Sequence, residues 1–275
     1  MNMVSNVPYV MESPTEWQRL ERKTVSAETL RQLDMVGLRP GMRALDAGCG
    51  TGAVARVMAH QVTRAGAVLA LDRSAERLQH AKHLAVDEGL SHLAFVHREI
   101  DEPPPANDRE SFDFVWSRFV FEYLPQPART LRNLIQYAKV GGTVVVGDLD
   151  CNGLIHYPIA PELERGLDVL VKSLAGFYDP YTGRKLFHLL REAGLAQLQV
   201  EVSPYHLYPG AAPDDAIDNW SEKFRVLRPT VVNSFESEAE YDRFAKLFID
   251  HLKDPAVFSY TTLVLVAGRK LPPAD

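Results

Sequence analysis

The sequence predicts an α/β fold built on a mostly parallel sheet with helices on both faces. Between residues 43 and 148, short apolar segments rich in β-branched residues alternate with segments of helical periodicity. Strands that alternate with helices form parallel sheets, because each helix returns the chain to the same end of the sheet. The segment 43–52, Arg-Ala-Leu-Asp-Ala-Gly-Cys-Gly-Thr-Gly, further indicates a buried strand, a glycine-rich turn and the start of a helix.

The elements of this alternation follow from apolar periodicity and from helix-ending signals. We predict strands at 43–47, 67–72, 93–98, 112–117 and 143–148. The intervening helices are predicted at 53–62, at 75–88 and from Pro127 to the glycines Gly141 and Gly142. Ser74 is a suitable N-cap for the second of these helices, because its hydroxyl can accept a backbone hydrogen bond.

The two ends of the chain add elements outside the alternation. A capping box at 13–16 predicts a helix through Trp17 and Leu20, and a second helix ends at Gly37. We expect these N-terminal helices to lie across the mouth of a ligand site. Beyond residue 150 the pattern predicts helices at 161–175, 184–193, 213–228 and 237–252, and strands at 198–202 and 261–267.

Composition excludes several classes of protein. The 275 residues carry a net charge of −6, which argues against a general nucleic-acid partner. No apolar run is long enough to span a membrane. Two cysteines, Cys49 and Cys151, form no disulfide framework and no zinc-ligand spacing, so no metal is expected. Residues 1–10 lack the features of a secretory signal, and we therefore expect a cytoplasmic protein.

The glycine-rich turn at 48–52 is the strongest functional signal. Glycines at 48, 50 and 52 let the backbone bend sharply and let a ligand approach it closely. Asp46 places a carboxylate beside this turn, which suits an ammonium group and disfavours a phosphate. Asp72 ends the next strand and could accept both hydroxyls of a ribose. The glycine pattern alone also fits a dinucleotide fingerprint, so a nicotinamide-dependent dehydrogenase remains an alternative.

Four segments together resemble one family. They are 45–52, Asp72, 112–115 with 123–127, and 140–146. Through these segments the chain resembles the class I S-adenosylmethionine-dependent methyltransferases, in particular the small-molecule branch that includes quinone-ring methylases. The resemblance covers roughly residues 40 to 150. The resemblance implies a Rossmann-like, seven-stranded, mostly parallel sheet with an N-terminal helical cap and a helical insertion before the last strand. It implies domain bounds of 1–40 for the cap and 41–275 for the methyltransferase domain, with substrate-side helices at about 151–190 and 205–255.

The resemblance also implies the cofactor and its contacts. S-adenosyl-L-methionine, converted to S-adenosyl-L-homocysteine, would use Asp46 and the carbonyls near Gly48 and Ser117 for its ammonium group. Glu99 stands where the family usually carries an aspartate for the adenine, with Asp101 as the alternative in register. The carboxylate of the cofactor would need a cation, for which Arg19 and Arg118 are the candidates. The candidate cofactor-binding residues are Asp46, Gly48, Cys49, Gly50, Asp72, Arg73, Glu99, Ile100, Ser117 and Arg19.

The expected reaction is in-line transfer of a methyl group to oxygen, nitrogen or carbon of a small organic molecule. A base is needed only where the nucleophile must lose a proton. His156 and Tyr157 are the first candidates, because they directly follow the strand at 143–148. Further candidates are Asp148, Asp150, Tyr178, Tyr181, Tyr205, His206 and Tyr208.

Three alternatives to a small-molecule methyltransferase remain. A protein or RNA methyltransferase is disfavoured by the net negative charge of the chain. A non-methylating cofactor-binding protein could share the fold. The dehydrogenase is disfavoured by Asp46, which would repel a pyrophosphate. As partners we expect a small-molecule methyl acceptor and no nucleic acid, in a monomer or homodimer.

Overall fold

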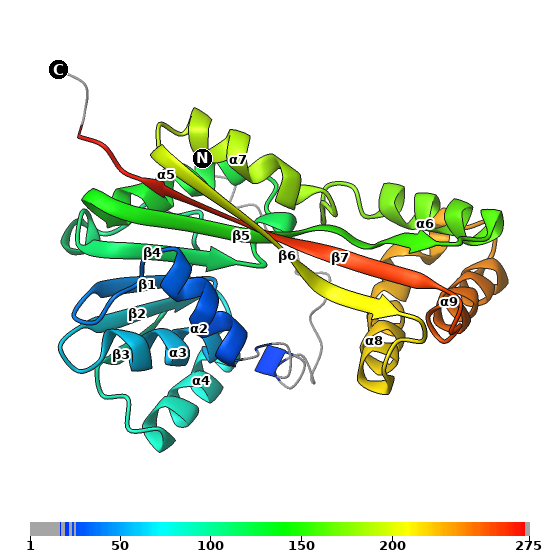
Figure 1. Ribbon diagram of the computed structural model, residues 1–275, viewed down its shortest axis with the longest axis horizontal. Coiled ribbons are helices and arrows are strands. Elements are labelled where there is room, and N and C mark those ends of the chain that lie inside the picture. Colours follow the sequence, from blue (N-terminus) through cyan, green and yellow to red (C-terminus); the bar gives the residue numbers. More distant parts are fainter. Residues whose placement is uncertain (1–16, 18–19, 22–23, 25, 273–275) are drawn as a thin grey trace.

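A seven-stranded sheet organises the chain (Figure 1). The computed structural model describes residues 17, 20, 21, 24 and 26–272. The strand order is β3-β2-β1-β4-β5-β7-β6, and β7 runs antiparallel to the other six strands. The strands are β1 (Arg43–Ala47), β2 (Ala67–Asp72), β3 (Leu93–His97), β4 (Phe112–Arg118), β5 (Ala138–Tyr157), β6 (Ala196–Pro209) and β7 (Phe258–Arg269). The predicted α/β class and the order of its elements are confirmed.

Helices cover both faces of the sheet (Figure 1). The α-helices are α2 (Ser26–Met35), α3 (Ala53–Val62), α4 (Ala75–Asp87), α5 (Pro127–Tyr137), α6 (Pro161–Ser173), α7 (Thr182–Glu192), α8 (Asp214–Val231) and α9 (Glu238–Leu252). Helices α2, α3 and α4 pack on one face, and α5 and α7 pack on the other. The predicted N-cap of α4 is confirmed, since Ser74 Oγ accepts a hydrogen bond from the Arg77 N–H.

The alternation of side chains along β5 explains why both faces are covered. Val145 packs with the helices of one face, whereas Val144 and Val146 pack with those of the other, and all three are fully buried. A strand buried on both faces has an almost continuous apolar sequence. This is the pattern that 143–148 shows.

Strand β5 is much longer than predicted. It was expected to end at residue 148 and instead continues to Tyr157, paired with β7. The register shifts between Asp150 and Ile155, and Cys151 there has a φ of 58°. Such a bulge breaks the period of two by which a strand is identified, so the sequence pattern ends early. The helical element expected from about 151 therefore begins only with α6.

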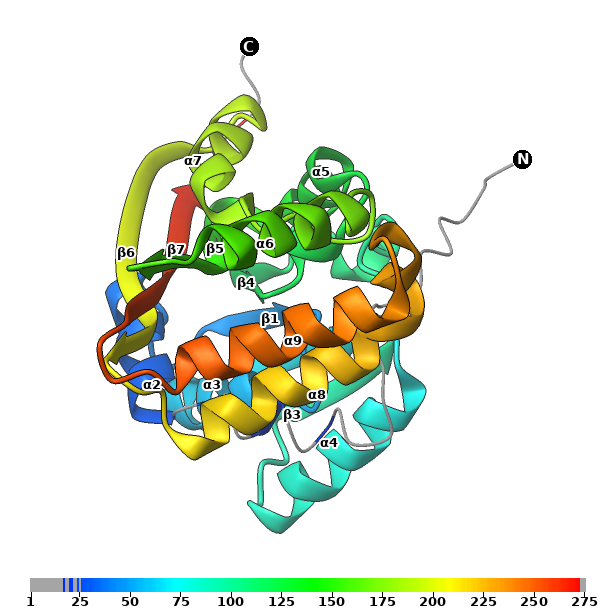
Figure 2. The same ribbon diagram turned by 90° about the vertical axis from the view of Figure 1, so that its right-hand side faces the viewer.

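The outer parts of β5, β6 and β7 leave the core of the sheet and support a helical lobe of α6, α8 and α9 (Figures 1 and 2). Figure 2 shows α8 and α9 side by side, with α6 across the strand ends. The lobe has its own apolar core, in which the Phe248 ring lies 4.9 Å from that of Trp220 and 5.2 Å from that of Phe224. The helices predicted at 213–228 and 237–252 are confirmed as α8 and α9.

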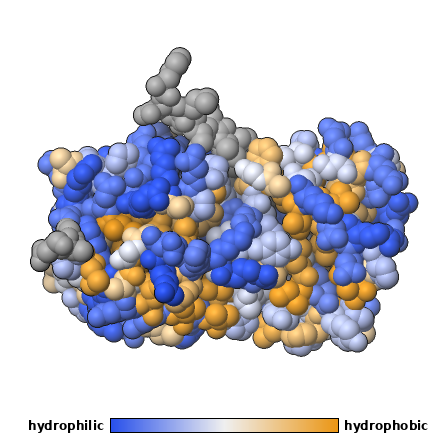
Figure 3. Space-filling model, turned by 90° about the horizontal axis from the view of Figure 1, so that it is seen from above, coloured by the Kyte–Doolittle hydropathy of each residue, from blue (hydrophilic) through white to orange (hydrophobic). Residues whose placement is uncertain are grey.

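The N-terminal helices are described only in part. The capping box at 13–16 lies outside the described residues, whereas Trp17, Leu20 and Glu21 are helical. Helix α2 packs on α3 through the fully buried Leu33. Among the helices that the structure describes, none has the length and apolarity needed to cross a membrane. Seen from above, the surface is mostly hydrophilic with separate hydrophobic patches (Figure 3).

Candidate active site

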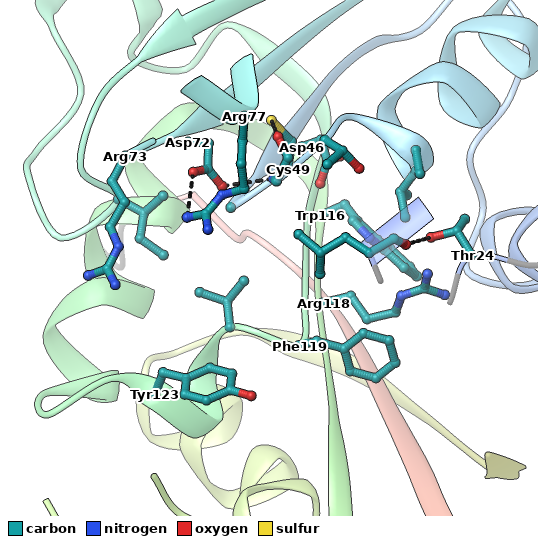
Figure 4. Close-up of a pocket in the computed structure, with 18 of the residues that line it drawn as sticks. Thr24, Asp46, Cys49, Asp72, Arg73, Arg77, Trp116, Arg118, Phe119 and Tyr123 are labelled. Carbon is teal, nitrogen blue, oxygen red and sulfur yellow. Dashed lines mark hydrogen bonds and ion pairs between the residues drawn. The ribbon is translucent and has the colours of Figure 1, made fainter. Parts of the chain in front are cut away.

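A large cavity opens at the carboxyl ends of β1, β2 and β4, next to the first turn of α3 (Figure 4). Its space, the open mouth included, amounts to about 1230 Å³. Ligands of open α/β sheets bind at this edge, where the strand order reverses. Here the reversal lies between β1 and β4. Leu20 and Thr24 from the N-terminal region also line the cavity.

Asp46, at the end of β1, is a buried acid in the wall of this cavity. Its side chain is 3% exposed, and its Oδ2 atom has no hydrogen-bond partner in the described protein. Burial raises the pKa of Asp46 to about 7, although the nearby Arg118 guanidinium lowers it. A buried polar atom without a partner is costly, so a ligand cation at Oδ2 would be stabilised.

The turn after β1 forms the floor of the cavity. Gly48 has a φ of 81°, and a Cβ atom added there would lie 2.5 Å from Val120 Cγ2. Gly50 has a φ of 56° and donates its backbone N–H to Asp72 Oδ2 at 2.8 Å. Asp72 Oδ1 accepts the Ser74 N–H at 2.8 Å, and Arg77 lies 3.4 Å from the same oxygen. Asp72 therefore fixes the turn as well as lining the cavity. A carboxylate has about four acceptor positions, so it keeps capacity for a ribose.

The next part of the cavity is lined by Arg73, Glu99 and Ile100. Burial raises the pKa of Glu99, which the nearby Arg73 opposes. Asp101, the alternative in register, lines only a smaller side recess that Glu99 also reaches. Of these two candidates for the adenine, Glu99 is therefore the one that lines the main cavity.

Arg118, at the end of β4, is a second charged group in the cavity. Its Nη1 donates to Gln32 of α2 at 2.8 Å, and its guanidinium stacks 4.9 Å from the Phe119 ring centroid. Burial lowers the pKa of Arg118. The other predicted partner for a carboxylate, Arg19, lies outside the described residues.

Of the predicted residues Ser117 and Cys49, only Cys49 lines the cavity. Ser117 is fully buried, is not among the residues lining the cavity, and donates its hydroxyl to the Ala47 carbonyl at 2.9 Å. Its prediction as a cofactor residue is not supported by this position. Cys49 does line the cavity, and burial raises the pKa of its thiol. The thiol thus stays protonated and packs as a small side chain.

The structure does not bring His156 and Tyr157 to the cavity. Both lie on the outer part of β5, in the helical lobe, because β5 continues past the sheet core. His156 lines a separate small cavity with Trp220 and Phe248, and its Nε2 interacts with the Gly153 carbonyl at 2.9 Å. Tyr157 is 79% exposed. Their prediction as catalytic residues assumed a strand that ends at residue 148, whereas the longer β5 places both away from the main cavity.

The segment after β4 supplies residues that the sequence reasoning did not assign to the site. Phe119, Val120, Glu122, Tyr123 and Leu124 all line the cavity. Figure 4 shows Phe119 and Tyr123 across the cavity from Asp46 and Asp72. Their position directly after the carboxyl end of a central strand is the sequence signal by which they could have been assigned to the site.

Comparison with known proteins identifies the family. Residues 38–194 match the methyltransferase domain family, which is more than half of the chain. The chain belongs to this family. This methyltransferase is similar to the demethylmenaquinone methyltransferase of Halalkalibacterium halodurans, with 29% identity over 212 residues, 71% of this chain and 82% of that protein. The predicted S-adenosylmethionine-dependent enzyme class is confirmed.

Solved structures agree on the fold of this methyltransferase. A SAM-dependent methyltransferase from Aquifex aeolicus superposes with a TM-score of 0.51 at 21% identity, covering 71% of this chain and 92% of the other. The cyclase SpnF gives a TM-score of 0.53 at 18% identity, covering 88% and 82%. Similarity at this level of identity shows the fold alone, because unrelated functions share the same fold.

The residues present fit S-adenosyl-L-methionine. Asp46 Oδ2 is a buried acceptor without a protein partner, and the floor at Gly48 and Gly50 carries no side chain. When bound, S-adenosyl-L-methionine supplies a methyl group on a cationic sulfur. Asp46 would hold the ammonium group, Asp72 the ribose and Glu99 the adenine. In the part of the chain that the structure describes, no group of His, Cys, Asp and Glu side chains could hold a metal ion.

Proposed function

We propose that this methyltransferase transfers the methyl group to a small aromatic molecule that carries a hydroxyl or amino group, at a ring carbon or at that heteroatom. The observation that supports cofactor binding in the cavity is the buried, unpartnered Oδ2 of Asp46. Aromatic side chains in the cavity support an aromatic acceptor: Trp116 lies beside Asp46, and Phe119 and Tyr123 line the opposite wall. Aromatic walls stack well with flat rings and with a sulfonium cation.

The relatives give this acceptor class further support. The Halalkalibacterium relative is named for demethylmenaquinone, and a ubiquinone biosynthesis O-methyltransferase of Citrobacter koseri is 33% identical over 41% of this chain and 45% of its own. Both names refer to quinones. A hydroxylated ring is also compatible with the carboxylate of Glu122 in the same wall.

Two measurements test this proposal. Calorimetry should show that S-adenosyl-L-homocysteine binds and that NAD does not. Transfer of labelled methyl groups should then be measured with a reduced naphthoquinone, a catechol, an aliphatic amine and total RNA. Incorporation into the two aromatic compounds supports the proposal. Incorporation only into the amine or RNA would contradict the aromatic class, and binding without any transfer would favour a non-methylating protein of this fold.

We further propose a cytoplasmic protein that exists as a monomer or homodimer. Both cysteines, Cys49 and Cys151, are free thiols in the structure, which suits a reducing compartment. Light scattering during size-exclusion chromatography measures the oligomeric state, and a stable trimer or larger assembly would contradict the proposal.

A further inference from the structure

A pair of buried carboxyl groups lies at the acceptor wall of the cavity, apart from the residues assigned to the cofactor. Glu122 belongs to the short helix η2 (Phe121–Tyr123), and Asp148 lies on β5. Glu122 is 4% exposed and Asp148 is fully buried. The Glu122 backbone N–H donates to Asp148 Oδ2 at 3.0 Å, and the two side chains also interact through a hydrogen bond. Glu122 lines the cavity, whereas Asp148 lies behind it.

The contact between these carboxyl groups requires a proton. Two ionised carboxylates are acceptors only, so a hydrogen bond between them forms when one is protonated. Burial, and then the neighbouring Glu122, raise the pKa of Asp148 well above its usual range. We therefore infer that the pair holds one proton near neutral pH.

Tyr178 is a further neighbour of Glu122 behind the cavity wall. Its hydroxyl accepts a hydrogen bond from Asn152 Nδ2 at 3.3 Å and also interacts with the Glu122 side chain. Burial raises the pKa of Tyr178 well above its usual range, so its hydroxyl stays neutral and can donate. A hydroxyl that accepts from Asn152 directs its proton to Glu122. A hydrogen bond from the Tyr178 hydroxyl favours the carboxylate form of Glu122.

The place of Glu122 in the cavity suits contact with a methyl acceptor. The ammonium partner Asp46 and the ribose partner Asp72 lie on one wall, and Phe119 and Tyr123 on the other (Figure 4). A cofactor held by Asp46 and Asp72 would supply its methyl group in the space between these residues and the second wall. Glu122 directly precedes Tyr123 on that wall.

We propose that Glu122 is the catalytic base that takes the proton of the acceptor's nucleophilic group, with Asp148 as a positioning residue behind it. This inference rests on the proposed function. As the acceptor atom forms its bond to the methyl carbon, the carbon–sulfur bond breaks and its electron pair stays on sulfur. The proton of the acceptor passes to the Glu122 carboxylate and then to water. Charge is balanced, because a cationic sulfur becomes a neutral thioether and one proton is released.

Binding of two cofactor analogues tests the position of Glu122 without any acceptor. Sinefungin has an amine-bearing carbon in place of the sulfur of S-adenosyl-L-homocysteine, so it presents an ammonium group toward the methyl position. In Glu122→Gln, calorimetry should show sinefungin binding weakened about tenfold, and S-adenosyl-L-homocysteine binding changed by less than about twofold. The control Glu99→Gln removes a carboxylate at the adenine end and should affect both ligands equally. Equal effects of Glu122→Gln on both ligands, or no effect, would overturn the proposal.

A second variant covers the case in which Glu122→Gln does not fold. In Asp148→Asn the amide can still donate to Glu122, while the shared proton is removed. The ratio of sinefungin affinity to S-adenosyl-L-homocysteine affinity should therefore stay as it is in the wild type. A fall in this ratio in Asp148→Asn would overturn the proposal. A wild-type protein that binds neither analogue contradicts the cofactor assignment itself. A protein that passes these binding tests but methylates no aromatic compound contradicts only the acceptor class and leaves the assignment of Glu122 in place.

Discussion

The Asp72 carboxylate accepts the backbone N–H of Gly50 at 2.8 Å, so the last residue of β2 holds the turn that follows β1. The two strands are adjacent and parallel, with Ala47 opposite Leu71. Their carboxyl ends therefore meet at one edge of the sheet. This contact links the shape of the cofactor turn to the residue that would bind the ribose, and it gives Asp72 two separable roles.

Substitution of Asp72 should reduce both ligand affinity and stability. In Asp72→Ala the Gly50 and Ser74 N–H groups lose their acceptor, which should cost about 1–3 kcal/mol of unfolding free energy. Loss of the ribose contact should weaken S-adenosyl-L-homocysteine about tenfold or more. The control Ser74→Ala removes only the N-cap of α4 and should lower the melting temperature without changing affinity. Normal affinity of Asp72→Ala in calorimetry would remove Asp72 from the site.

Ligand affinity should depend on pH through Asp46. Its pKa is raised to about 7 in the unliganded protein, and only the ionised form can pair with an ammonium group. Below pH 7 the affinity for S-adenosyl-L-homocysteine should therefore fall, approaching about tenfold per pH unit, and between pH 7 and 8 it should level off. Calorimetry from pH 5.5 to 8 measures this profile. The same slope in Asp46→Asn would show that another group is responsible.

Asp46→Asn should also stabilise the unliganded protein at pH 8. The pKa of Asp46 is 3.8 when unperturbed and about 7 in the fold, so between these values the folded state binds the extra proton. The free energy of unfolding therefore falls as pH rises through this window, by up to about 4 kcal/mol. Asparagine carries no charge, so removing this cost should raise the melting temperature at pH 8 and change it little at pH 4. An equal shift at both pH values would argue against a charge effect.

Gly50→Ala should impair ligand binding more than it impairs folding. Gly50 has a φ of 56°, and an added Cβ would lie 3.2 Å from Leu20 Cδ1, within the wall of the cavity. Gly141→Ala is the matched control, because Gly141 has a φ of 79° and open space around the added Cβ. Both variants should lose about 1–2 kcal/mol of stability through backbone strain. Only Gly50→Ala should lose affinity for S-adenosyl-L-homocysteine, and a similar loss in Gly141→Ala would assign the effect to strain.

His156→Phe should leave ligand binding unchanged and reduce sensitivity to acid. His156 lies in the helical lobe, with its ring 5.6 Å from Phe248 and 5.0 Å from His251. Burial lowers the pKa of His156, so the fold prefers the neutral ring. Stability is therefore lost as pH falls below the unfolded value of 6.5 through the lower folded value, and this loss should be smaller in the variant. A methyl-transfer rate more than about tenfold lower, with normal affinity, would restore His156 as a catalytic candidate.

The sequence predicted the central sheet and the cofactor side of the site because both depend on local signals. Asp46 and Asp72 lie at the carboxyl ends of strands that are defined by their own composition, and the glycine turn directly follows the first of these strands. The outer half of β5 was missed, since the bulge at Cys151 interrupts the alternation of its side chains. That error placed His156 and Tyr157 at the site. Glu122 was missed because its partners, Asp148 and Tyr178, are distant in sequence and meet only in the fold.

The strands β5, β7 and β6 run without interruption from the sheet into the helical lobe. The half that holds the donor molecule is thus joined to the half carrying α8 and α9 by three paired strands. None of the described residues that line the main cavity belongs to α6, α8 or α9. Exchange of these helices at the far end of the ribbon should therefore leave binding of the sulfonium nucleoside intact.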